Sequence, residues 1–169
     1  MQKLSVRHSF PCTPATFWEM FWDDEYDQMV LDAADVTREI LESIEHPDGV
    51  VTQRIRTTPN RELPKAVATV VGAAKLIYTQ ESRFDPNAST LTWQVTPNVM
   101  ADKVTAKGQL LVRETPTGCE RLVEGEIAVK VRFVGGRIEK AIVDDVTRSY
   151  AKAAEVAQAW LAARPDRRV

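Results

Sequence analysis

The amino-acid sequence predicts an α+β fold: an antiparallel sheet of about seven strands, two short helices after the first strand, and one long C-terminal helix. Three observations predict it. Segments in which apolar and polar residues alternate, as in half-buried strands, follow one another across short turns. The pair Thr13-Pro14, after the first of these segments, is typical of a helix start. Residues 137–164 contain neither Pro nor Gly, which favours one long helix.

The N-terminal part supplies the first strand and the two short helices. Residues 3–10 alternate, with Leu4 and Val6 on the apolar side. Thr13 is predicted to cap the first helix, and a second short helix is expected from about Asp24.

The middle of the chain is predicted to be a succession of hairpins. His46-Pro47-Asp48-Gly49 is a strong turn signal, and Asp85-Pro86-Asn87 and Thr115-Pro116-Thr117-Gly118 also separate neighbouring strands. Strands joined in this way pair antiparallel. Residues 65–74 fit a short helix or a strand. The expected strands are Val36–Ile44, Val50–Thr57, Lys75–Phe84, Ser89–Thr96, Lys103–Glu114 and Cys119–Phe133.

The C-terminal helix is predicted to be amphipathic. Apolar and small residues recur at three- and four-residue steps, whereas Glu139, Lys140 and Asp144 are expected on the opposite side. The expected inner side is Ile138, Ile142, Val146, Ser149, Ala153, Ala157 and Trp160. The small residues in its middle fit either close packing of the sheet on the helix or an internal cavity.

Length and composition bound the function. A chain of 169 residues with 44% apolar residues is expected to form one domain, residues 1–169, with a self-sufficient core. A net charge of −2 argues against a nucleic-acid-binding protein. No apolar stretch has the length of a membrane span or the form of a signal peptide, so a cytoplasmic location is expected. Cys12 and Cys119 are expected to be reduced rather than paired.

No motif names a reaction. The sequence has no phosphate-binding loop, dinucleotide fingerprint or nucleophile elbow, and His8 and His46 stand alone, so neither a metal nor a cofactor is expected. Asp145 is the one carboxylate near the inner side of the C-terminal helix, with Ser149 and Tyr150 nearby. It is a weak candidate for a general base; the alternative is that it pairs with Arg148 or with a strand residue.

Four clustered aromatic residues leave two interpretations open. Phe17 and Phe21 share one side of the first helix, and Trp18 and Trp22 share another, so one sheet cannot bury all four. Either the second helix covers Trp18 or Trp22, or an exposed pair makes transient contact with a membrane or a partner protein.

The order of elements resembles the helix-grip fold of the START-like superfamily, also called the SRPBCC or birch-pollen-allergen-like superfamily. The resemblance covers the whole chain. Its most specific part is the junction Phe133-Val134-Gly135-Gly136-Arg137-Ile138-Glu139-Lys140-Ala141-Ile142, which resembles the strand-to-helix passage of an uncharacterised bacterial branch of the superfamily. The resemblance implies a curved sheet wrapped around the C-terminal helix and favours a cavity between them.

The resemblance also implies a function: binding or carrying of an apolar or amphipathic small molecule, such as a lipid, an isoprenoid, a sterol-like molecule or a polyketide. One alternative is an aromatase/cyclase-type enzyme with Asp145 or Tyr150 as acid–base group. Another is a protein-interaction module like the chaperone-activating members. The residues expected to line the ligand site are Phe17, Phe21, Met29, Tyr78, Gln80, Trp93, Val95, Ile127, Val129, Ile142, Val146, Ser149, Ala153 and Trp160.

Overall fold

The computed structural model describes all residues, 1–169, and consists of one seven-stranded sheet with helices on one face. The elements in chain order are β1 (Gln2–Phe10), α1 (Pro14–Phe21), α2 (Asp24–Ala34), β2 (Val36–Glu45), β3 (Val51–Pro59), α3 (Lys65–Val71), β4 (Tyr78–Asp85), β5 (Thr90–Pro97), β6 (Val104–Thr115), β7 (Gly118–Val129), α4 (Gly135–Ala162) and the short 3-10 helix η1 (Pro165–Arg167). The predicted α+β class is confirmed.

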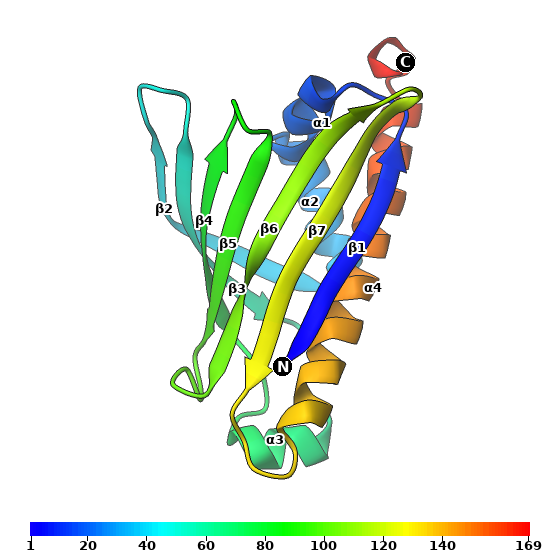
Figure 1. The fold of residues 1–169 in the computed structure, drawn as a ribbon. Coiled ribbons are helices and arrows are strands. Elements are labelled where there is room, and N and C mark those ends of the chain that lie inside the picture. The colour runs from blue at the N-terminus through cyan, green and yellow to red at the C-terminus, as the bar shows by residue number, and fades with distance from the viewer.

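The strands lie in the order β1-β7-β6-β5-β4-β3-β2, and every neighbouring pair is antiparallel. All neighbours except β1 and β7 are consecutive strands in the chain. The predicted turns join β2 to β3, β4 to β5 and β6 to β7, whereas the connection from β3 to β4 contains α3. The first strand closes the order by pairing with the last one, where Val6 lies opposite Val123. Figure 1 shows α4 running alongside β1 and β7, and α1 and α2 behind the same sheet.

Local capping explains where the N-terminal helices begin. The Thr13 side chain accepts a hydrogen bond from the backbone N–H of Thr16, and Pro14 follows as the first helical residue. Asp23 caps α2 by accepting from the N–H of Tyr26 at 2.9 Å. The same carboxylate accepts a hydrogen bond of 3.1 Å from the indole of Trp160, which ties the start of α2 to the end of α4.

The main core lies between α1, α2, α4 and the sheet half formed by β1, β7 and β6. Helix α4 makes its main contacts with β1, β7 and α2, whereas α1 lies on β6 and β7. Phe17, Met20 and Leu161 are fully buried there. At about 1.5–3 kcal/mol for each large apolar side chain, this packing stabilises one half of the sheet against the helices.

Three expectations about the elements are refined or corrected. Residues 65–74, which fitted a helix or a strand, contain the helix α3. Strand β4 begins at Tyr78 rather than Lys75, and β7 ends at Val129 rather than Phe133. The reason for the second difference is pairing: Val129 lies opposite the first residue of β6, and β1 reaches only to Ile127, so β7 has no partner farther on.

The chain after β7 turns directly into α4. Phe133 has a positive φ of 69° and is 88% exposed, so it is not an inward-facing strand residue. Glu139 was expected on the outer side of the helix, but it is only 5% exposed. Its carboxylate accepts a hydrogen bond of 2.9 Å from the N–H of Val129 and pairs with the amino group of Met1 at 2.8 Å. The carboxylate thus satisfies a backbone donor at the end of β7.

Candidate functional site

The predicted ligand-lining residues divide into two groups by burial. Phe17, Ile127, Val129, Ala153 and Trp160 are buried. The others are partly exposed: Phe21, Met29, Tyr78, Gln80, Trp93, Val95, Ile142, Val146 and Ser149.

Four of the partly exposed residues lie on the inner face of the sheet, and three lie on α4. Tyr78 and Gln80 on β4, and Trp93 and Val95 on β5, belong to the inner face of the sheet, because they alternate with exposed outer residues such as Gln94. Helix α4 does not pack chiefly on these strands but on β1 and β7. The inner face of β4 and β5 is therefore apolar and aromatic yet incompletely covered.

The Trp93 ring packs against two glycines on this face. Gly108 on β6 lies opposite Gly125 on β7, and a Cβ atom at either position would meet the Trp93 indole at 2.6 or 2.9 Å. The two glycines therefore let the ring lie across both strands. The buried indole N–H of Trp93 has no hydrogen-bond partner, so it is available to a polar atom of a bound molecule.

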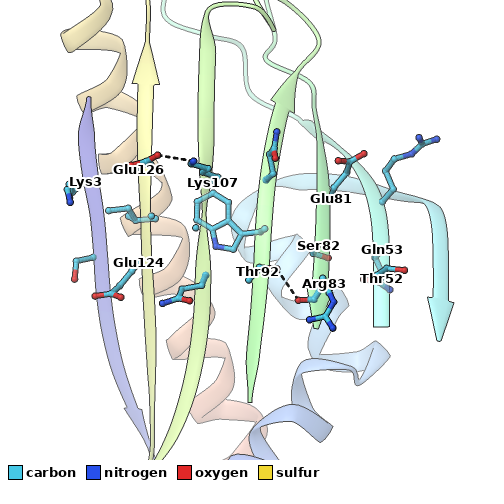
Figure 2. Close-up of a pocket in the computed structure, with 18 of the residues that line it drawn as sticks. Lys3, Thr52, Gln53, Glu81, Ser82, Arg83, Thr92, Lys107, Glu124 and Glu126 are labelled. Carbon is cyan, nitrogen blue, oxygen red and sulfur yellow. Dashed lines mark hydrogen bonds and ion pairs between the residues drawn. The ribbon is translucent and has the colours of Figure 1, made fainter. Parts of the chain in front are cut away.

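The other face of the sheet holds an open hollow of about 1030 Å³. Figure 2 shows charged side chains of the hollow, among them Lys107, Glu124 and Glu126, in front of the sheet and the helices behind it. The lining is mainly charged and polar, and Lys107 and Glu126 form an ion pair of 3.3 Å across it. This hollow lies on the face away from α4, and its chemistry differs from the apolar internal site that the sequence predicts.

Arg121 is a site residue that the sequence reasoning did not single out. It lies on the inner face of β7 and is only 2% exposed. Its Nη2 donates to Nδ1 of His8 at 3.0 Å and to the carbonyl oxygen of Tyr150 on α4 at 2.9 Å. The guanidinium carbon lies 5.3 Å from the centre of the Phe10 ring and 5.0 Å from that of Tyr150. The alternation that placed Val123 and Ile127 inward also places Arg121 inward, so strand phase was the available signal.

Electrostatics around Arg121 follow from burial. Burial lowers the pKa of Arg121 below its ordinary value, since the charged guanidinium loses its hydration. The pKa of His8 is also lowered, first by burial and then by the positive charge of Arg121. Neutral His8 accepts at Nδ1, so its proton lies on Nε2. Burial raises the pKa of the Tyr150 hydroxyl, which stays protonated and can donate to a ligand oxygen.

The weak catalytic candidate Asp145 lies at the rim of α4. Its side chain is 50% exposed, and its carboxylate pairs with Arg148 at 3.2 Å and with Arg61 at 3.6 Å. This is the ion-paired alternative that the sequence left open. Asp145 therefore lacks the apolar surroundings that would make it a strong general base.

The four clustered aromatic residues of α1 and its end do not share one environment. Trp18 is buried; its ring centre lies 4.4 Å from that of Phe84, and its indole donates to Ser89 Oγ at 2.8 Å. Trp22 is 37% exposed. The exposed pair that a membrane contact would use therefore does not form, because Trp18 belongs to the core.

The two cysteines lie close together in the interior. The thiols of Cys12 and Cys119 are free and buried, with their sulfur atoms 3.9 Å apart. No cluster of three or more His, Cys, Asp or Glu side chains could hold a metal ion. No helix combines the length and the apolar character needed to cross a membrane.

Comparisons with known proteins identify the fold. A START superfamily protein from Mycobacterium smegmatis has a TM-score of 0.61 and 13% identity, with 94% of this chain and 98% of that chain covered. The Zhui aromatase/cyclase from Streptomyces sp. R1128 has a TM-score of 0.64 and 13% identity over 96% of each chain. Ara h 8.0201 has a TM-score of 0.64 and 10% identity, with coverages of 96% and 99%. The protein therefore has the START-like, helix-grip fold.

Sequence comparison assigns the family. No curated protein matches the sequence. The model of one family, described as "Protein of unknown function (DUF2505)", matches residues 5–161, which is most of the chain. The chain therefore belongs to the DUF2505 family.

Proposed function

We propose that this protein binds an apolar or amphipathic small molecule, of the lipid, isoprenoid, sterol-like or polyketide kind, between the inner face of the sheet and α4. The observation that carries the proposal is the incomplete covering of an apolar and aromatic face. Trp93 and Val95 on the sheet, and Val146 on α4, keep part of their surface exposed although they point toward the interior.

The physical basis of the proposed binding is the burial of this surface. Each square ångström of apolar surface that a ligand removes from water contributes about 25 cal/mol to the free energy of binding. Polar groups on the same face, the Trp93 indole N–H and the Gln80 amide, would orient the ligand. A protein with the same fold is an aromatase/cyclase, which supports a site for a hydrophobic molecule in this architecture.

Two matched variants test where a ligand binds. Val95→Trp places a large side chain on the inner face of β5, whereas Thr96→Trp places the same side chain on the exposed outer face one residue away. We expect the first variant to weaken the binding of a hydrophobic probe at least about tenfold and the second to leave it unchanged. Binding is measured by titration calorimetry against a panel of fatty acids, sterols and polyketides.

Native mass spectrometry gives an independent test. Protein purified from its own host is expected to carry a molecule of lipid size. A clean mass of the unliganded protein, together with no binding across the panel, would contradict the proposed function. Equal affinity in the Val95→Trp and Thr96→Trp variants would instead show that the ligand does not bind on the inner face of β5.

The aromatase/cyclase alternative depends on Tyr150 in this structure. Its protonated hydroxyl lies beside Arg121 and can donate to a substrate oxygen, whereas Asp145 is ion-paired at the rim. Under this alternative, Tyr150→Phe abolishes turnover of a polyketide substrate and retains its affinity. Unchanged turnover in Tyr150→Phe would exclude Tyr150 as the acid–base group.

A further inference from the structure

Arg121 is a buried cation without an anion. Every ion pair of the structure involves other residues. The acceptors of its Nη2, the His8 ring and the Tyr150 carbonyl, are neutral, and so is the buried Tyr26 hydroxyl beside the guanidinium. Its buried Nε–H has no acceptor. Buried charges in proteins are ordinarily paired, and an unpaired buried donor is rare. The protein thus keeps a positive charge and a free donor inside the fold.

The surroundings of the guanidinium limit what can pair with it. The rings of Phe10 and Tyr150 lie against it, so an acceptor must reach the Nε–H near the guanidinium plane. A carboxylate oxygen meets this requirement and forms a charge-assisted hydrogen bond. One carboxylate carries the single negative charge that balances one Arg, whereas a doubly charged phosphate would leave an excess negative charge in the interior.

From Tyr150, beside Arg121, a partly exposed side of α4 runs toward the N-terminus of the helix. Tyr150, Val146 and Ile142 follow at four-residue steps, so they lie one above another on one side of the helix. All three retain some exposed surface. A molecule with its charged end at Arg121 can therefore lay an apolar part along α4, opposite the uncovered face of β4 and β5.

We propose that the ligand of this protein is an amphipathic acid, with its carboxylate bound by Arg121 and its apolar part placed along Val146 and Ile142. This inference rests on the proposed function and names the chemical class of the ligand. The energetic role of Arg121 is then to select an acid over a neutral molecule of equal apolar surface.

The test compares three probes that share one alkyl chain: dodecanoate, dodecanol and dodecyl phosphate. Affinities are measured by titration calorimetry for the wild type, Arg121→Gln and the control Arg113→Gln. Arg113 pairs with Glu120 at the exposed surface, so the control removes an arginine outside the interior. We expect the wild type to bind dodecanoate at least about tenfold more tightly than dodecanol. Arg121→Gln should lose this preference and keep its affinity for dodecanol.

The outcomes separate the two proposals. Equal affinity of the wild type for dodecanoate and dodecanol overturns the assignment of Arg121 and leaves the proposed function standing. Tighter binding of dodecyl phosphate than of dodecanoate overturns the choice of a carboxylate. Binding of none of the probes, with none across the wider panel, overturns the proposed function itself. The comparison in the wild type still tests the preference for an acid even if Arg121→Gln does not fold.

Discussion

Replacing Gly108 by Ala tests the way in which β6 and β7 support Trp93. The added Cβ would lie 2.1 Å from the carbonyl oxygen of Glu124 and 2.6 Å from Cζ2 of Trp93, and real Cβ atoms essentially never approach closer than 3.0 Å. Both the β7 backbone and the indole must therefore move.

The magnitude follows from these contacts and from a third, with the Gly125 Cα at 2.7 Å. Overpacking of a folded interior costs about 1–3 kcal/mol, and weakening one backbone hydrogen bond between β6 and β7 adds about 1 kcal/mol. We therefore expect Gly108→Ala to lower the free energy of unfolding by about 2–4 kcal/mol. Because the Trp93 contact is one of three, the others being with the β7 backbone at Glu124 and Gly125, combining the change with Trp93→Ala should recover about 1 kcal/mol of that loss.

Urea denaturation followed by circular dichroism measures both effects. Gly136→Ala is the matched control, because a Cβ at this position in the first turn of α4 meets nothing within 4 Å. Alanine is favoured over glycine in a helix, so this variant should be more stable than the wild type by up to about 1 kcal/mol. A Gly108→Ala variant as stable as the wild type would refute the reasoning. So would a full loss of stability that is unchanged in the Trp93→Ala background.

Three further predictions concern single side chains. Hydrogen bonding lowers the pKa of Glu139 below its ordinary value of 4.5. Its contribution to the free energy of unfolding is therefore fully present above pH 4.5 and is lost as the pH falls through the lowered pKa. In Glu139→Gln, the urea midpoint should depend less on pH over this acid range than in the wild type. The pKa of His8 is lowered below its ordinary value of 6.5, first by burial and then by Arg121, so the free energy of unfolding should decrease as the pH falls below 6.5. His8→Gln should remove this decrease in urea midpoints, and an unchanged decrease would contradict the assignment to His8. Asp23→Ala removes the cap of α2 and the acceptor of the Trp160 indole. Calorimetric melting should show that the free energy of unfolding falls by about 1–2 kcal/mol. An unchanged melting curve would contradict a stabilising role for these two bonds.

Local features of this fold were readable from the sequence. Thr13-Pro14 starts α1 because a side-chain oxygen can cap free N–H groups and proline suits the first helical position. The turn His46-Pro47-Asp48-Gly49 ends in a glycine with φ of 84°, a conformation that glycine adopts without strain. Such features depend on neighbours in the chain, so the sequence pattern suffices to predict them.

The places where prediction and structure differ depend on distant partners. β7 ends at Val129 because β6 and β1 end beside it, and no pattern within residues 119–133 contains that information. Glu139 looks like an outward residue by helical phase, yet the backbone N–H of Val129 draws its carboxylate inward. The candidate site shows the same division, since strand phase placed Trp93 and Val95 on the inner face but did not show that α4 leaves them partly uncovered.

Apart from residues 65–74, which fitted a helix or a strand, the sequence by itself determined the order of the elements, the antiparallel hairpins and the side of each strand that faces the helix, because periodicity and turn chemistry are local. Only the tertiary structure decided that Trp18 is buried, that Asp145 is ion-paired, and that Arg121 lies in the interior with no carboxylate beside it. Burial and charge pairing depend on which segments meet in space. Strand phase places Arg121 inward, but its lack of an anionic partner could be recognised only after β1, β7 and α4 were seen together.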